Sequence, residues 1–231
     1  MEPSDCKNMP LDQMDRIFSV LRHELGNSVN SLKVTIEVLC SSFSLLDDHK
    51  KLDLLHLAQG QVARQHDFLN GLKAYTRADA GDLTAVAVDL FWPEYVKTVS
   101  ARLAARNIRY RQSAPMENCV VLGNTAALER LLDLLVDNAL DAVEEAEKPA
   151  IFMSSFKSDR FFNIVIRDNG CGVPAENRHK IFIPFFSTRK DRPGMGLPMA
   201  CKLLAGMGGD LEISTGPEGG SEAHVRLVPA G

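Results

Sequence analysis

The chain has 231 residues, of which 45% are hydrophobic and 24% are charged, and its 26 basic and 30 acidic residues give a formal net charge of −4. This composition is typical of a soluble globular protein of one or two domains, and the mild acidity argues against non-specific binding to nucleic acid or to an anionic membrane. No apolar run approaches the roughly 18 residues of a spanning helix, the polar start MEPSDCKNMP predicts no signal peptide, and five scattered cysteines without CxxC spacing predict no disulfide framework and a cytoplasmic location.

Residues 1–80 are predicted to form a helical hairpin. After two steps of four, the apolar residues from Ile17 to Leu46 recur at alternating steps of four and three, which is the seam of a helix that packs against another helix. A polar break at residues 47–50 precedes a second apolar stripe from Leu52 to Tyr75. One hairpin has too little core to bury both stripes, whereas two hairpins bury them in a four-helix bundle, so we predict a homodimer.

Residues 77–84 form a polar linker, and residues 81–231 are expected to form a second domain that mixes strands and helices. We expect strands at 86–90, 108–113, 119–122, 150–157, 161–168, 211–214 and 223–228, and helices at 93–105, from Asn124 to about 147, and at 199–207. This order is not a regular βαβ alternation. The predicted fold class is therefore α+β, with a dimeric four-helix bundle followed by an α/β sandwich.

Three glycine-containing segments lie in the second domain, at 168–172 (DNGCG), 194–197 (GMGL) and 219–221 (GGS). Glycine lets backbone N–H groups approach a ligand, and the N-terminus of a helix favours phosphate. A Rossmann site is excluded because the segment at Gly194 follows no strand, and a P-loop is excluded because no GKS or GKT follows. On a predicted apolar helix, Asn138 and Asp141 lie three residues apart on one face, and an amide oxygen beside phosphates suits Mg²⁺.

These segments resemble, in order and spacing, the boxes of one known family. Asn138, Asp168–Gly172, Phe182–Arg189, Gly194–Gly196 and Gly219–Ser221 resemble the N, G1, F, G2 and G3 boxes of the ATP-binding domain of sensor histidine kinases, which belongs to the GHKL (Bergerat-type) ATPases. The resemblance covers nearly all of the chain from about residue 86 onward. The nucleotide site that it implies comprises Asn138, Asp141, Asp168, Gly170, Gly172, Thr188, Arg189, Lys190, Gly194, Gly196 and Leu197.

The resemblance also implies a role for each part of this site. Asp168 is expected to accept a hydrogen bond from the adenine amino group, while Gly170 and Gly172 let the purine lie close. Asn138 is expected to bind Mg²⁺, and the glycines at 194 and 196 to offer backbone donors to the phosphates. Residues 187–193 are expected to form a short lid in which either Arg189 or Lys190 meets the γ-phosphate. Phe182, Phe185 and Phe186 are interpreted as an apolar hinge for that lid.

The first helix carries residues 21–27 (LRHELGN), which resemble the H box of the nitrogen-regulatory sensor subgroup, as Pro184–Arg189 resembles its F box. The resemblance implies that His23 is the phosphoacceptor, that Glu24 hydrogen-bonds the ring proton and acts as general base, and that Asn27 orients a hydrolytic water. A zincin site is excluded because the position four residues after His23 is Asn27 rather than histidine. We expect the partner to dock around His23 and the start of the second helix.

The implied function is an ATP-dependent protein-histidine kinase that autophosphorylates His23, passes the phosphoryl group to an aspartate of a response-regulator receiver domain, and can also dephosphorylate that regulator. Three departures from the boxes stand out: Leu134 replaces a usual second asparagine, Asp141 a basic or neutral residue, and Pro198 a third glycine. They motivate an alternative, an ATP-independent phosphotransfer and docking module with a degenerate nucleotide site. A gyrase-like or mismatch-repair ATPase is disfavoured because Leu134 stands where those enzymes place a water-activating glutamate. Whether transfer runs in cis or in trans stays open.

Overall fold

The computed structural model describes residues 12–113, 119–158, 160–189, 192–217 and 219–230, and within residues 12–24 it describes only two side chains, those of Ser19 and Arg22. The chain divides into two compact units. One contains the hairpin up to Arg77 together with Pro184–Met195, and the other contains Ala78–Ile183 and Gly196–Gly231. Each unit is described by itself below.

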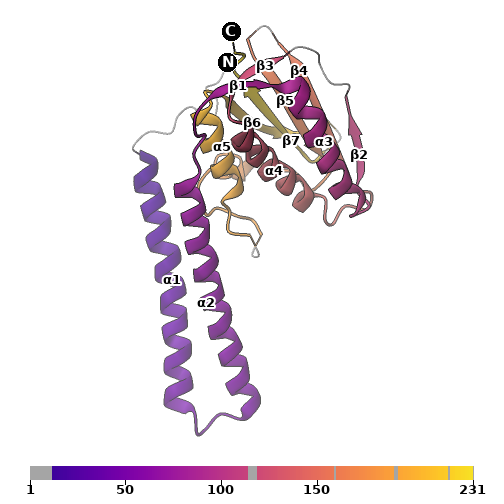
Figure 1. Cartoon of the computed structure of the whole chain (residues 1–231). Helices are drawn as coiled ribbons and strands as arrows, with labels where there is room; N and C mark the ends of the chain where they lie inside the picture. Colours follow the sequence, from indigo (N-terminus) through magenta and orange to yellow (C-terminus); the bar gives the residue numbers. More distant parts are fainter. Residues whose placement is uncertain (1–11, 114–118, 159, 190–191, 218, 231) are drawn as a thin grey trace. The chain divides into compact units, whose positions relative to one another are not determined.

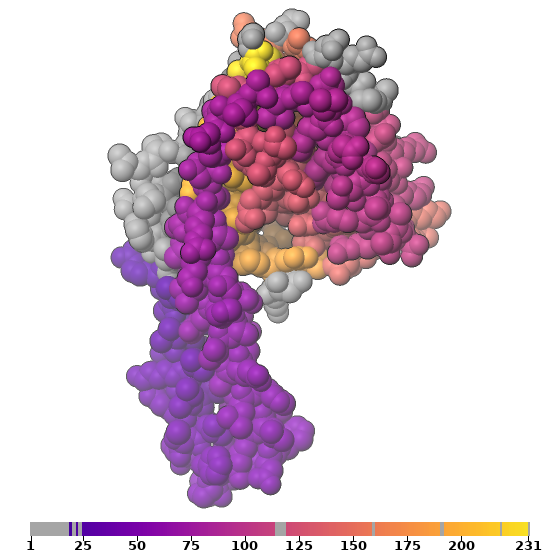
Figure 2. Space-filling view, in the orientation of Figure 1, coloured from indigo at the N-terminus to yellow at the C-terminus, as the bar shows by residue number. Residues whose placement is uncertain are grey.

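The hairpin consists of two long helices, α1 (Asp12–Ser42) and α2 (Asp48–Arg77), which run antiparallel (Figure 1). The turn between the helices lies at residues 43–47, earlier than the predicted polar break at 47–50, because α2 already begins at Asp48. The Asp47 carboxylate caps the start of α2, where it accepts a hydrogen bond from the backbone N–H of Lys50 at 2.8 Å. Leu25, Leu32 and Leu39 recur every seven residues on the half-buried side of α1. Side chains of α2 cover most of the hairpin face seen in Figure 2. The heptad-like spacing therefore builds the α1–α2 seam, as predicted.

The second unit is built on a five-stranded sheet with the order β2-β4-β5-β7-β6. Its strands are β2 (Arg109–Gln112), β4 (Ala150–Lys157), β5 (Phe162–Asp168), β6 (Asp210–Thr215) and β7 (Ser221–Leu227). β2 pairs with β4 in parallel, and the other neighbours pair antiparallel. A separate antiparallel pair joins β1 (Thr84–Ala87) to β3 (Val120–Gly123). The expected α/β sandwich domain is confirmed.

Three helices cover one face of the large sheet: α3 (Val88–Ala104), α4 (Thr125–Ala142) and α5 (Gly196–Gly206) (Figure 1). A short 3₁₀ helix, Ala175–Asn177, follows β5. Along β7, Ala223, Val225 and Leu227 are buried, and the residues between them are only half-buried. The alternation has a period of two, so one sheet face packs on the helices and the other carries polar side chains. As predicted, Asn124 caps α4, where its side chain accepts from the N–H of Ala127 at 3.1 Å.

Several boundaries differ from the sequence-based predictions. The strand expected at 86–90 ends at Ala87, where its pairing with Val120 stops, and the N–H of Val88 instead donates to the carbonyl of Cys119 at 2.8 Å. α4 ends at Ala142, about one turn before the expected end, because the N–H of Cys171 caps the Ala142 carbonyl at 3.3 Å. α5 begins three residues early, at Gly196.

Two further findings concern the composition. Cys40, Cys119 and Cys171 carry free thiols, whereas Cys201 is disulfide-bonded. Among the described residues, no helix has the length and apolarity needed to cross a membrane. Pro198 lies in the first turn of α5, where its missing N–H would have no helical partner, so the chain tolerates this departure from the third glycine.

Candidate functional site

Asp168 ends β5 as a buried carboxylate at the turn between two glycine segments. Its Oδ1 atom accepts hydrogen bonds from the N–H of Gly170 at 2.8 Å and from the N–H of Ser221 at 3.1 Å. Burial raises the pKa of Asp168, and these two hydrogen bonds oppose the rise. Among the described residues, no hydrogen bond engages Oδ2. The Asp168 carboxylate is thus fixed in place through Oδ1, and Oδ2 can accept a hydrogen bond from a donor such as an amino group.

The glycines around Asp168 let segments far apart in sequence lie in contact. A Cβ atom on Gly170 would lie 2.1 Å from the carbonyl oxygen of Ala142, and one on Gly220 would lie 2.2 Å from the carbonyl oxygen of Asp168. We expected residue 170 to be a glycine because a purine lies against it. The structure gives a different reason, since the end of α4 occupies the space that a side chain at this position would need. Gly220 was outside the predicted site residues, and its signal in the sequence was the GGS segment.

Asn138 lies on α4 beside the N-terminus of α5. A Cβ atom on Gly196 would lie 3.3 Å from Asn138 Oδ1, and the buried Nδ2 atom of Asn138 has no hydrogen-bond partner among the described residues. Gly196 and Leu197 form the first turn of the eleven-residue helix α5, whose leading N–H groups favour an anion. An amide oxygen beside such an anion site is a ligand that Mg²⁺ accepts, so the residues present fit a magnesium–phosphate group.

The remaining candidates for the nucleotide site are divided between the two compact units. Asp141 is half-buried on α4, one turn from Asn138, and Gly172 has φ +68° and lies beside Gly220. These residues belong to the same unit as Asp168 and Gly196. Thr188, Arg189 and Gly194 belong instead to the unit that contains the hairpin, and Lys190 lies outside the described residues.

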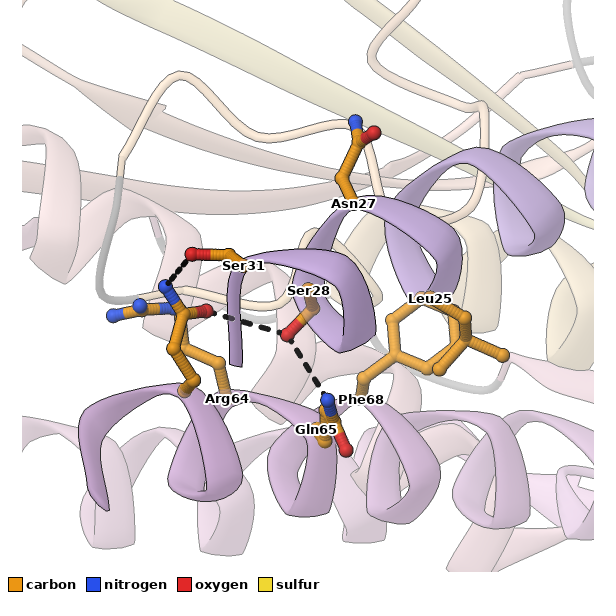
Figure 3. Close-up of a pocket in the computed structure, with 8 residues that line it drawn as sticks. Leu25, Asn27, Ser28, Ser31, Arg64, Gln65 and Phe68 are labelled. Atoms are coloured by element: carbon orange, nitrogen blue, oxygen red, sulfur yellow. Dashed lines mark hydrogen bonds between the residues drawn. The ribbon is translucent and has the colours of Figure 1, made fainter. Parts of the chain in front are cut away.

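The predicted phosphoacceptor region lies in α1. The backbone of His23 and Glu24 is helical, and their side chains lie outside the described residues, whereas Asn27 is exposed one turn later. A cavity of about 330 Å³ lies between the helices there (Figure 3). It is lined by Leu25, Asn27, Ser28 and Ser31 of α1 and by Gln61, Arg64, Gln65 and Phe68 of α2.

A chain of hydrogen bonds crosses the seam at this cavity. Gln65 Nε2 donates to Ser28 Oγ at 3.3 Å, Ser28 Oγ donates to Gln61 Oε1 at 3.4 Å, and Gln61 Nε2 donates to Ser31 Oγ at 2.9 Å (Figure 3). Asn27 points away from α2 in the same view. Because the helices run antiparallel, the later half of α2 accompanies the H-box region, and the expectation that the start of α2 lies there is wrong.

Comparisons with known proteins agree with this geometry. Residues 123–230 match the family described as Histidine kinase-, DNA gyrase B-, and HSP90-like ATPase. The C4-dicarboxylate transport sensor protein DctB of Rhizobium meliloti is 32% identical over 119 residues, which is 52% of this chain and 19% of that protein. The signal transduction histidine-protein kinase/phosphatase MprB of Mycobacterium leprae is 25% identical over 210 residues, which is 87% of this chain and 40% of that protein.

The fold likeness extends over both units. The structure of histidine kinase ThkA in complex with the response regulator protein TrrA has a TM-score of 0.64 and 18% sequence identity, and the match covers 96% of this chain and 63% of that chain. The chain spans about a fifth to two fifths of the length of the two curated relatives described above. The matches to MprB and ThkA thus include both the helical hairpin and residues 123–230 of this chain.

Proposed function

We propose that the chain is an ATP-dependent protein-histidine kinase. The proposal starts from the match of residues 123–230 to the histidine kinase-, DNA gyrase B- and HSP90-like ATPase family. Residues 1–80 would serve as the dimerisation and phosphotransfer hairpin, and residues 81–231 as the catalytic domain. One observation carries the proposal: the ATPase domain is joined to a long helical hairpin that bears an H-box sequence, and relatives named as histidine kinases align over both parts.

The nucleotide would be held by groups that are already oriented. Asp168 Oδ2 would accept from the adenine amino group, because Oδ1 is engaged by two backbone donors. The N-terminus of α5 at Gly196 and Leu197 would face the phosphates. Mg²⁺, when bound with ATP, would neutralise phosphate charge, and Asn138 would be its protein ligand. These groups support ATP binding in spite of Leu134 and Asp141.

His23 would supply the nucleophile. Imidazole is largely neutral near pH 7, so one ring nitrogen can attack the γ-phosphorus while the other holds a proton. The new N–P bond forms as the bond from the γ-phosphorus to the β,γ-bridging oxygen breaks, and ADP leaves with the electron pair. Glu24 would accept a hydrogen bond from the ring N–H and remove that proton as charge develops. The phosphoryl group would then pass to an aspartate carboxylate of a response-regulator receiver domain.

The comparisons support the partner and a second activity. ThkA was solved with a response regulator, and MprB is named as both kinase and phosphatase. Asn27 is exposed on α1, and its amide would orient a water toward the phosphoaspartate of a docked regulator. We therefore propose a phosphatase activity on the same face of α1 as the kinase activity.

The hairpin surface supports a homodimer. Val29, Ile36 and Phe43 are spaced seven residues apart along the α1 side, and Leu55, Val62 and Leu69 are spaced likewise along α2. All six side chains are 46–55% exposed within one chain. Two unpartnered apolar stripes with heptad spacing would be buried when two hairpins pair into a four-helix bundle.

Label transfer tests the proposal. The full chain is incubated with Mg²⁺ and γ-labelled ATP beside a His23→Gln variant and a matched His49→Gln variant, whose imidazole lies on the exposed start of α2. Acid-labile, base-stable label in the wild type and in His49→Gln but not in His23→Gln would support the kinase. Nucleotide binding without label would indicate a phosphatase-biased enzyme. If neither label nor nucleotide binding is found, the kinase is refuted and the ATP-independent phosphotransfer module remains.

A further inference from the structure

A segment of the sequence that is distant from the hairpin packs on α2. Phe185 stacks on Phe68 with ring centroids 4.0 Å apart and an interplanar angle of 26°. The two residues are 117 positions apart in sequence, yet Pro184–Met195 clusters in one compact unit with the hairpin. Pro184 and Met195, at the two ends of this segment, are both buried. The two ends of the segment are therefore packed, whereas Ser187, Thr188, Arg192 and Pro193 between them are exposed.

A glycine in the second half of α2, six residues before its end, makes room for this segment. A Cβ atom on Gly71 would lie 3.1 Å from Met195 Cγ, 3.7 Å from a ring carbon of Phe185 and 3.9 Å from Pro193 Cβ. Glycine is unfavourable inside a helix, where alanine is preferred. The close approach of the segment accounts for a glycine at this position of α2.

The backbone of the segment is shaped to present the Phe185 ring. Phe185 has φ +68°, which is uncommon for a residue with a side chain, and its N–H donates to the Gly194 carbonyl at 3.1 Å. Gly194 closes the turn, because a Cβ atom there would lie 2.3 Å from the Phe186 carbonyl oxygen. Such a conformation persists where surrounding contacts hold it, and here the stacking and the hydrogen bond do so.

The docking point lies near the predicted phosphoacceptor along the hairpin. Phe68 and Leu25 line the same cavity and lie close together across the seam (Figure 3). Leu25 is two residues after His23 on α1. The segment that meets Phe68 through Phe185 also carries Thr188 and Arg189, three and four residues after Phe185.

We propose that Phe68 and Gly71 form a dock on α2 that positions the segment Pro184–Met195 for phosphorylation of His23. The proposal deepens and rests on the proposed kinase function. Phe68 would act as a positioning residue, because it stacks on Phe185 and so orders the segment that carries Arg189. The hairpin would thereby contribute to catalysis by ordering a part of the nucleotide-binding machinery.

Hydrogen exchange of the full chain tests the dock directly. The Phe185 amide is the probe, because its hydrogen bond to Gly194 depends on the docked conformation. Phe68→Ala is expected to speed exchange of this amide at least tenfold, and Phe68→Tyr, which keeps the ring, to leave it within twofold of wild type. Gly71→Leu should speed exchange of the Phe185 amide similarly, although leucine favours the helical state of α2 more than glycine does. Faster exchange in this variant would therefore report loss of the dock and not unfolding of α2. Leu57→Ala is the matched control, since Leu57 is exposed on the same face of α2 about three turns earlier.

Labelling kinetics test the positioning role. We expect Phe68→Ala to lower the His23 labelling rate at saturating ATP at least threefold, with nucleotide affinity within twofold of wild type, because Asp168 and Asn138 lie in the other unit. Unchanged exchange of the Phe185 amide in Phe68→Ala, or a labelling rate equal to that of Leu57→Ala, would overturn the proposal. If the wild type takes no label, the kinase function fails, and the exchange experiment still decides whether the dock exists.

Discussion

The Asp168→Asn substitution separates recognition of the nucleotide from support of the fold. Asp168 Oδ1 accepts from the N–H groups of Gly170 and Ser221, and an asparagine keeps these two bonds with its single carbonyl oxygen. Its NH₂ group then takes the place of Oδ2. A donor would face the adenine amino group, which is also a donor. A hydrogen bond to a charged group contributes about 1.5–3 kcal/mol, so ATP affinity should fall about 10- to 150-fold.

The same substitution should not weaken the fold. Burial raises the pKa of Asp168 above its ordinary value of 3.8, so the native carboxyl binds a proton more readily than the unfolded chain does. Its ionisation therefore costs stability as the pH rises from about 3.8 through the folded pKa. Asparagine carries no charge, so the melting temperature of Asp168→Asn at pH 7 should equal or exceed that of the wild type.

Calorimetric titration with ATP and with an N6-dimethylated ATP measures the recognition. The wild type should lose affinity for the analogue, whereas Asp168→Asn should bind both nucleotides with similarly weak affinity. Asp137→Asn, which changes an exposed carboxylate on α4 that pairs with Arg102, is the control and should leave both affinities unchanged. Undiminished ATP binding by Asp168→Asn, or a melting temperature several degrees below wild type at pH 7, would refute the reasoning.

Three further outcomes are expected. Gly170→Ala pushes a methyl group against the Ala142 carbonyl, and overpacking of about 1–3 kcal/mol should lower the melting temperature by about 2–12 °C; a change under 1 °C would contradict the close approach. Burial lowers the pKa of His224 below 6.5, so its contribution to stability is present above pH 6.5 and is lost as the pH falls below it; urea titrations should show a weaker acid dependence for His224→Gln than for the wild type. Val29→Glu combined with Ile36→Glu should reduce the mass measured by light scattering from twice the chain mass of 25.4 kDa to once, and an unchanged mass would argue against this dimer face.

Much of the architecture could be predicted from local patterns in the sequence. Heptad-like spacing in the first 80 residues predicted α1 and α2, although the turn between them lies at residues 43–47, a few residues before the predicted break. Asn124 predicted the start of α4, since a cap depends only on a side chain and the N–H three residues later. Period-two apolar runs predicted β4 and β5. Such signals are local, because helix faces and strand faces repeat within a few residues.

The order and spacing of the glycine segments and Asn138 led to the proposal of a nucleotide site, but the packing reason for each glycine could not be predicted from them. Gly170 is a glycine because the carbonyl of Ala142, 28 residues earlier, occupies the place of a side chain. Gly220 is a glycine because it lies against the backbone of Asp168. Neither contact has a periodic signature, since it joins segments that meet only after the sheet has formed.

Tertiary structure also decided where elements end and which segments associate. The end of α4 depends on the Cys171 N–H, and the end of β1 depends on the short partner strand β3. Apolar patterning alone therefore predicted a helix and a strand that both end later in the sequence than α4 and β1 do. The stacking of Phe185 on Phe68 joins residues that no local pattern connects. The sequence by itself determined the types of the main elements, because these follow from side chains a few positions apart, and it suggested the residues of the candidate site. The partners of each glycine and the docking of Pro184–Met195 were decided by packing between distant segments.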